Sequence, residues 1–246
     1  MADQLTVVNA FVSYSHTDRG WARQVKRELR AVGIEAFLAH ENIQVSEKWR
    51  RRILQELGRC DLFVPLLSQN FVHSKWAPQE AGFIVSRPEV VIAPLSIDET
   101  VSFGFFADVQ CGYIGSDGVT YDLHVEPLFE RLADAVPRQI LPTLIRRAAN
   151  AGCFRRAEFL MSPLVPLFPL LTSWEAQTLA GAAVENPQIW SAWQCRTEYL
   201  PEFIREHENN IEPETLRILQ YQIEKNERYI PSPEELAERE SETYRQ

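Results

Sequence analysis

The sequence predicts an α/β fold built on a parallel sheet, followed by an all-helical domain. In residues 1–137, short apolar runs alternate with amphipathic helical segments. These runs are continuously apolar, which indicates strands buried on both faces, as in a parallel sheet that is covered by helices. After residue 137 the strand-like runs stop, and helical periodicity takes over. We therefore expect two domains, residues 1–137 and residues 138–246.

The first domain shows an ordered series of strands and helices. Strands are expected at residues 5–13, 34–39, 61–68 and 89–97, with a short one near residue 113. One helix follows Asp18, carries an apolar stripe of Ala22, Val25, Leu29 and Val32, and ends at Gly33. A second follows Ser46, carries Trp49, Ile53, Leu54 and Leu57, and ends at Gly58; a third begins at Ser74, and a fourth spans residues 123–136. Such folds bind ligands at the carboxyl ends of the strands, so a site is expected in the loops after Ser13, Ala39 and Ser68.

The second domain reads as a series of helices. They are expected at residues 145–160, 173–184, 187–193, 197–207 and 213–230. Thr172 and Glu175 have the spacing of a capping box. The most apolar run, residues 159–174, is too short to cross a bilayer as a helix and contains three prolines. We interpret it as buried packing or an interface.

Charge and cysteine usage exclude several classes of function. The net charge is −9, and both halves of the chain are acidic, which does not fit a nucleic-acid-binding protein. The four cysteines lie far apart without a CxxC pair, which argues against a disulfide framework and against a zinc site. No signal peptide is evident, so we expect a cytoplasmic protein that does not enter a membrane.

The stretch HSKWAPQEAGF, residues 73–83, places Trp76 and Glu80 four residues apart at the start of a helix. This spacing puts both side chains on one helical face. A carboxylate in a first helical turn is often a solvated charge that favours the helix dipole. From periodicity alone, Glu80 is either such a surface charge or a functional carboxylate beside an aromatic wall.

Three sequence boxes together resemble the TIR (Toll/interleukin-1 receptor) domain. They are AFVSYSHTD at residues 10–18, FLAHENIQVSEKW at residues 37–49 and LFVPLLSQNFVHSKWAPQE at residues 62–80. The resemblance covers about residues 5–137 and implies a flavodoxin-like parallel sheet. The sequence departs from the family at Ala39, where many relatives carry aspartate, and in the BB loop, which lacks the Pro-Gly of many members.

The resemblance implies one of two activities. Some TIR domains only associate with one another, and others cleave NAD at the nicotinamide–ribose bond. In the second kind, the catalytic glutamate aligns with Glu80. The resemblance also implies that substrate contacts come from six residues, namely Tyr14, Ser15, His40, Glu41, Trp49 and Trp76. We expect no metal and no cofactor, because NAD+ is the substrate.

The layout, with a separate helical module after the TIR-like part, resembles bacterial defence proteins. We therefore expect a NAD+ nucleosidase that acts in anti-phage defence and releases nicotinamide and ADP-ribose or a cyclic isomer. Self-association through the TIR-like part is expected, and the helical domain would take a protein or small-molecule activator. The alternatives are a non-catalytic TIR adaptor and an effector that mimics host TIR domains.

Overall fold

The computed structural model describes residues 7–39, 47–113 and 126–228, apart from the side chains of residues 47–49 and 126–127. Two compact units divide the chain, Met1–Arg147 and Ala148–Gln246. The division falls in the last turn of helix α6 (Pro137–Ala149). The functional division expected between residues 137 and 138 stays a prediction.

The first unit is built on a parallel sheet, as predicted. Its strands are β1 (Asn9–Ser13), β2 (Glu35–Leu38), β3 (Leu62–Leu67), β4 (Val91–Ile92), β5 (Leu95–Ser96) and β6 (Gly112–Tyr113). They are ordered β2-β1-β3-β5-β6, with β4 also paired to β3, and every pairing is parallel. This order, with β1 and β3 side by side in the middle, is that of the flavodoxin-like fold.

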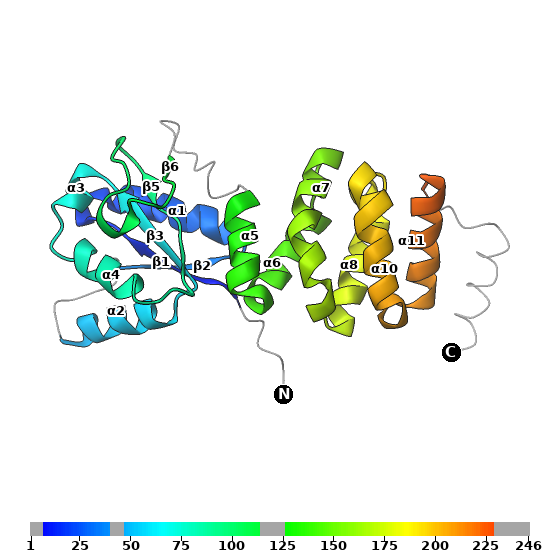
Figure 1. Cartoon of the computed structure of the whole chain (residues 1–246), viewed down its shortest axis with the longest axis horizontal. Helices are drawn as coiled ribbons and strands as arrows, with labels where there is room; N and C mark the ends of the chain where they lie inside the picture. Colours follow the sequence, from blue (N-terminus) through cyan, green and yellow to red (C-terminus); the bar gives the residue numbers. More distant parts are fainter. Residues whose placement is uncertain (1–6, 40–46, 114–125, 229–246) are drawn as a thin grey trace. The chain divides into compact units, whose positions relative to one another are not determined.

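Helices cover both faces of the sheet. They are α1 (Arg19–Ala31), α2 (Glu47–Arg59), α3 (Gln69–Val72), α4 (Ala77–Ile84), α5 (Glu126–Ala135) and α6, with 3₁₀ turns η1 (His16–Asp18) and η2 (Gly104–Phe106). Helix α1 lies on one side of the sheet, and α2 and α4 lie on the other (Figure 1). Phe11 and Phe63 pack on the α2/α4 side with their ring centroids 5.9 Å apart, so neighbouring strands share one aromatic core.

Several expected details of the first unit need correction. The strand expected at residues 89–97 is two short strands, because the chain leaves the sheet between Ile92 and Leu95. Leu54, expected on the apolar face of α2, is exposed. The apolar stripe of α1 is confirmed, and α1 is followed by Gly33 at φ +87°, a conformation that glycine adopts without strain.

The second unit is helical. It contains α7 (Phe154–Met161), η4 (Ser162–Leu170), α8 (Ser173–Glu185), α9 (Pro187–Trp190), the π-helical segment η5 (Cys195–Tyr199), α10 (Leu200–His207), η6 (Glu208–Asn210) and α11 (Pro213–Lys225). The single helix expected at residues 145–160 is wrong, because the chain breaks between α6 and α7 at a segment that contains Gly152. The proline-rich run forms the 3₁₀ helix η4, whose Leu164, Leu167 and Phe168 are buried, so its interpretation as packing is confirmed.

The capping box predicted at α8 is present and gives a first testable prediction. Thr172 Oγ1 accepts a hydrogen bond from Glu175 N, and Glu175 Oε2 accepts one from Thr172 N at 2.9 Å. Replacing Thr172 with alanine is expected to lower the free energy of unfolding of the second unit by about 1 kcal/mol. Thr178→Ala is the matched control, because that hydroxyl bonds only within the helix, to Trp174 O. Chemical denaturation of both variants measures the difference, and equal losses would contradict a capping role.

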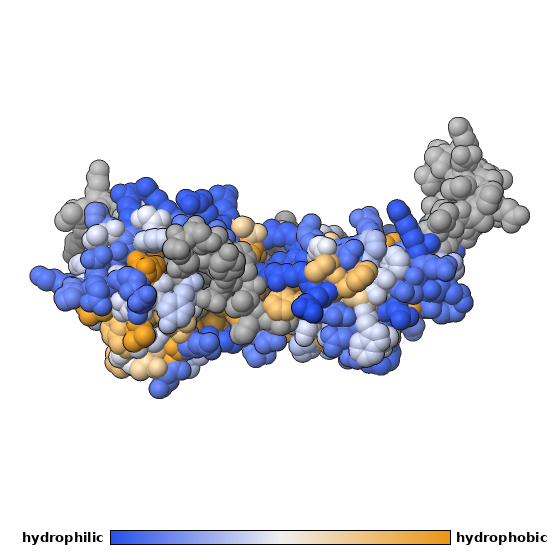
Figure 2. Space-filling view, turned by 90° about the horizontal axis from the view of Figure 1, so that it is seen from above, coloured by the Kyte–Doolittle hydropathy of each residue, from blue (hydrophilic) through white to orange (hydrophobic). Residues whose placement is uncertain are grey.

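The visible surface of both units in Figure 2 is mainly hydrophilic, with hydrophobic side chains in small groups. Within the described residues, no helix has both the length and the apolar character that crossing a membrane requires.

Candidate active site

The carboxyl ends of β1 and β3 are where a ligand site is expected in this sheet. From β1, the chain crosses to β2 on one side, whereas β3 and the strands after it extend the sheet on the other side. In open parallel sheets, ligands bind beside such a reversal of strand order, at the carboxyl ends of the strands. Ser13, the last residue of β1, is level with Pro65 of β3 at this edge.

Glu80 is brought to this edge by α4, the helix that follows β3 and α3. Its side chain is 3% exposed, which is unusual for a carboxylate that has no ion pair among the described residues. Ser13 Oγ donates a hydrogen bond to Glu80 Oε2 at 2.5 Å. The second oxygen, Oε1, is buried and has no hydrogen-bond partner within the described part of the chain.

This environment changes the acidity of Glu80. Burial raises the pKa of the Glu80 carboxyl from 4.5 to about 7, although the hydrogen bond from Ser13 acts in the opposite direction. At neutral pH the group is therefore divided between its ionised and neutral forms. A buried carboxyl with a raised pKa and an oxygen without a partner is typical of a functional site.

The start of α4 differs in detail from the expectation. The helix begins at Ala77, and the Ser74 hydroxyl accepts hydrogen bonds from the backbone N–H groups of Trp76 and Ala77, both at 3.3 Å. The N-cap position is Trp76, so the expected capping position of Ser74 is wrong, although its hydroxyl bonds to the backbone just before the helix. Trp76 and Glu80 do not share one environment, because the indole is 40% exposed.

A second group of polar side chains forms hydrogen bonds between the loops after β1 and β3 at the same edge. Asp18 was expected to cap α1, but its side chain does not accept a hydrogen bond from that helix. It accepts hydrogen bonds from Ser68 Oγ at 2.6 Å and from Asn70 Nδ2 at 2.9 Å. The loop after β1 is thus held to the segment after β3 by these hydrogen bonds.

The structure describes only part of the predicted substrate-binding set. Tyr14 is buried at 1% exposure, and Ser15 is half-buried. His40 and Glu41 lie outside the described residues, as does the Trp49 side chain. Substrate contacts by these residues and by Trp76 stay predictions.

Ser13 is the site residue that the sequence interpretation missed. The sequence predicts contacts from the loop after β1, with Ser13 only as the last residue of an apolar strand. Strand alternation could have found it, because Ser13 lies two residues after Phe11 and so faces the same side of the sheet. A serine on an otherwise aromatic and apolar face requires a polar partner, and Glu80 is that partner.

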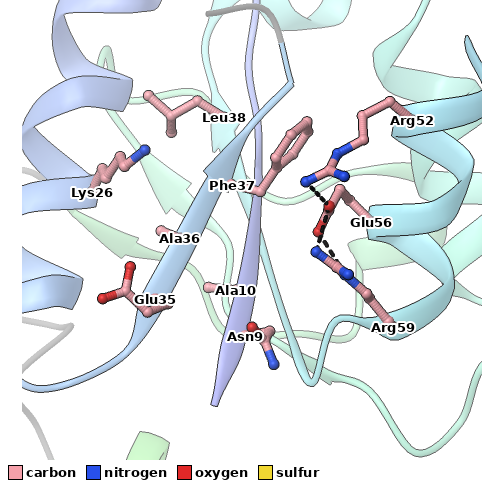
Figure 3. A pocket seen from close by; sticks show the side chains of 10 residues that line it. All are labelled: Asn9, Ala10, Lys26, Glu35, Ala36, Phe37, Leu38, Arg52, Glu56 and Arg59. Atoms are coloured by element: carbon pink, nitrogen blue, oxygen red, sulfur yellow. Dashed lines mark hydrogen bonds and ion pairs between the residues drawn. The ribbon is translucent and has the colours of Figure 1, made fainter. Parts of the chain in front are cut away.

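A groove along the outer edge of β2 is a separate feature (Figure 3). Figure 3 shows Lys26 and Glu35 on one side of the strand and three charged residues of α2 on the other. There, Glu56 Oε1 lies 2.6 Å from a guanidinium nitrogen of Arg52 and 2.6 Å from one of Arg59. Glu56 thus pairs with both arginines, and neither Glu80 nor Ser13 lines the groove. We therefore place the candidate site at the β1/β3 edge.

Within the described residues, no group of three or more His, Cys, Asp or Glu side chains is placed to hold a metal ion. Cys60 and Cys195 do not offer a nucleophile either, because burial raises the pKa of each thiol to about 12. At the sheet edge, Glu80 is the group whose pKa is clearly raised.

Residues 10–122 match a family model described as the TIR domain. No curated protein matches the chain. The matched segment begins in β1 and includes β3, α4 and the Ser13–Glu80 pair.

Proposed function

Because the chain contains a TIR domain at residues 10–122, we propose that it is a NAD+ nucleosidase, with Glu80 as the catalytic carboxylate. TIR domains act in signalling or in NAD cleavage, and one observation favours cleavage here. The Glu80 carboxylate is buried at the β1/β3 edge. Its Oε2 accepts a hydrogen bond from Ser13, and its Oε1 has no hydrogen-bond partner among the described residues. A domain that only associates with partners does not need a buried carboxylate without an ion pair, because such a group destabilises the fold.

The chemistry of NAD+ suits a single carboxylate. The bond between ribose C1′ and nicotinamide N1 breaks, and both electrons leave with nicotinamide, which departs as a neutral molecule. No acid has to protonate this leaving group, in contrast to glycosidases, which normally use two carboxyl groups. Positive charge develops on the ribose, and water then bonds to C1′ and releases its proton to solvent. If a nucleophilic atom of the ADP-ribose part bonds to C1′ in place of water, the product is cyclic.

Glu80 would act in this reaction in its ionised form. Oε1 would accept a hydrogen bond from a ribose hydroxyl, and the negative charge would stabilise the cationic transition state in a site with little water. Ionisation is only partial at pH 7, since the pKa of Glu80 is about 7. The rate of cleavage is therefore expected to rise with pH through this region.

We also propose self-association as part of this function, because TIR domains commonly self-associate. The segment after β5 carries several exposed large apolar side chains, namely Val101, Phe103, Phe105 and Tyr113. These residues equally support the alternative of a non-catalytic scaffold. Anti-phage defence, a cytoplasmic location and an activator of the helical unit remain further parts of the proposal.

The test is NAD+ cleavage by the purified full chain at increasing protein concentration, followed through nicotinamide, ADP-ribose and its cyclic isomer. Glu80→Gln is expected to lower the turnover number by about 100-fold or more, because the charge that stabilises the transition state is lost. Glu89→Gln is the matched control, since that carboxylate is exposed and pairs with Arg87. Wild-type turnover in Glu80→Gln would remove Glu80 from the mechanism. Absence of cleavage by the native chain at every concentration would favour the scaffold.

A further inference from the structure

We propose that Ser13 is a positioning residue for the Glu80 carboxylate. Its hydroxyl holds one carboxylate oxygen, Oε2, and the other oxygen, Oε1, which has no partner within the described residues, is left to accept a hydrogen bond from a ligand. This inference rests on the proposed function for the meaning of the site, but the contact itself can be tested without any catalysis. Ser13 lies in the first sequence box of the family resemblance, but it was not among the residues expected to contact substrate.

The strand geometry places Ser13 beneath α4. Side chains alternate along a strand, so Ser13 lies on the same face of the sheet as Phe11. That face is the one covered by α2 and α4, where Phe11 packs with Ala81 and Ile84 of α4. Glu80 is the residue before Ala81, and its carboxylate reaches the end of β1 where Ser13 stands. A β-strand terminus is a rigid support for such a contact.

Burial keeps water away from the hydrogen bond between Ser13 and Glu80 and strengthens it. Ser13 is fully buried and Glu80 nearly so, and water has little access to either group. The hydroxyl donates to a carboxylate, and such charge-assisted hydrogen bonds are shorter and stronger than those between neutral groups. One oxygen is therefore fixed by the protein, and the carboxylate cannot rotate without losing this bond.

No charged group competes with Ser13 for Glu80 within the described residues. The strands β1 (NAFVS) and β3 (LFVPLL) contain no charged side chain. Helix α2 packs against α4, but its Arg52, Glu56 and Arg59 pair with one another at the edge of β2. Beyond α4, Arg87 bonds to Glu89 and to backbone carbonyls. Ser13 is thus the hydrogen-bonding group that favours the ionised carboxylate.

The experiment measures the acidity of Glu80 directly. The full chain is labelled with ¹³C at glutamate carboxyl carbons, and the Glu80 resonance is assigned by its loss in Glu80→Gln. Ser13→Ala removes the donor and is expected to shift the pKa of Glu80 upward by about one unit or more. Ser13→Thr keeps the hydroxyl and is expected to hold the native value. Ser86→Ala is the matched control, because the Ser86 hydroxyl bonds to Phe83 O at the exposed end of α4.

The same variants separate positioning from a merely structural role. In Ser13→Ala, the acid limb of the pH profile of NAD+ cleavage is expected to move upward with the Glu80 titration, so activity at pH 7 falls about fivefold or more and recovers at higher pH. Ser13→Cys, close in volume but a weak donor, is expected to shift the titration in the same direction and covers the case in which the alanine variant does not fold.

Two results have distinct meanings. A folded Ser13→Ala protein whose Glu80 titrates as in the native chain would overturn the positioning role. A native chain without NAD+ cleavage, but with the expected titration shift in Ser13→Ala, would support the contact and contradict only the proposed function.

Discussion

Glu80→Gln is expected to make the N-terminal unit more stable than the native chain at pH 8, by up to about 3 kcal/mol, while the two proteins differ little near pH 4.5. The reason is the raised pKa of the buried carboxyl, about 7 in the folded chain against 4.5 for an ordinary glutamate. A neutral amide of the same shape occupies the site without the cost of burying a charge.

The sign of this effect follows from proton binding. Between pH 4.5 and pH 7, the folded chain keeps a proton on Glu80 that the unfolded chain has already released. Stability therefore falls as pH rises through this window, and the loss is complete above the folded pKa. This is the reverse of the usual carboxylate in a salt bridge, whose pKa is lowered and whose stabilising effect is lost in acid.

Denaturant unfolding of the native chain, Glu80→Gln and the control Glu89→Gln from pH 4.5 to pH 8 measures the effect. The difference between Glu80→Gln and the native chain should grow with pH, and Glu89→Gln should follow the native chain, since that side chain is exposed. A constant difference across the range would contradict an altered pKa. The Ser13 hydroxyl can still donate to the amide oxygen of glutamine, but this bond is weaker than one to a carboxylate and reduces the gain at pH 8. The slope with pH is therefore the decisive quantity.

A carboxylate that destabilises its own domain needs a functional reason. Sites that bind or react often keep buried charge at the expense of stability, so substitutions that remove the charge stabilise the fold and abolish activity. Glu80→Gln therefore links two measurements. A protein that gains stability at pH 8 and loses NAD+ cleavage would show that the same charge determines both.

Much of the fold was predictable from the pattern of residues. The continuous apolar runs indicated parallel strands correctly, since strands such as β3 (LFVPLL) are buried at every position. The apolar stripe of α1 was predictable because its apolar residues recur at helical spacing. Short elements were less predictable, because Pro94 and Gly152 interrupt patterns that look continuous in a sequence window. Asp18 was assigned to a cap because its distant partners, Ser68 and Asn70, follow a strand some fifty residues later.

The candidate site was predictable in its position but not in its contacts. Helical spacing and strand order placed Glu80 near the carboxyl ends of the central strands. Whether the side chain was solvated or buried depended on packing against β1, which no local pattern reports. The pairing with Ser13 spans 67 positions of the chain and depends on the register of β1 beneath α4. Contacts of this kind follow from the three-dimensional arrangement and have no short-range signature.

Phe63→Ala is expected to lower the free energy of unfolding of the N-terminal unit by about 3–5 kcal/mol, because a fully buried ring is replaced by a cavity. The Phe63 ring centroid lies 5.9 Å from that of Phe11 and 6.0 Å from that of Phe106, so the substitution removes packing shared by two strands and η2. A loss of this size is comparable to the whole stability of many domains.

A corresponding substitution in the helical unit tests whether the two units unfold separately. Phe203→Ala removes a buried ring whose centroid lies 5.3 Å from that of Phe168, within the second compact unit. Hydrogen exchange followed peptide by peptide reports each unit separately. Phe63→Ala should expose amides of the unit Met1–Arg147 alone, and Phe203→Ala those of the unit Ala148–Gln246. Equal loss of protection in both units from either variant would show that the chain unfolds as one body.

If the units respond separately, loss of NAD+ cleavage in Phe203→Ala would assign a regulatory role to the helical unit, since the fold around Glu80 remains intact.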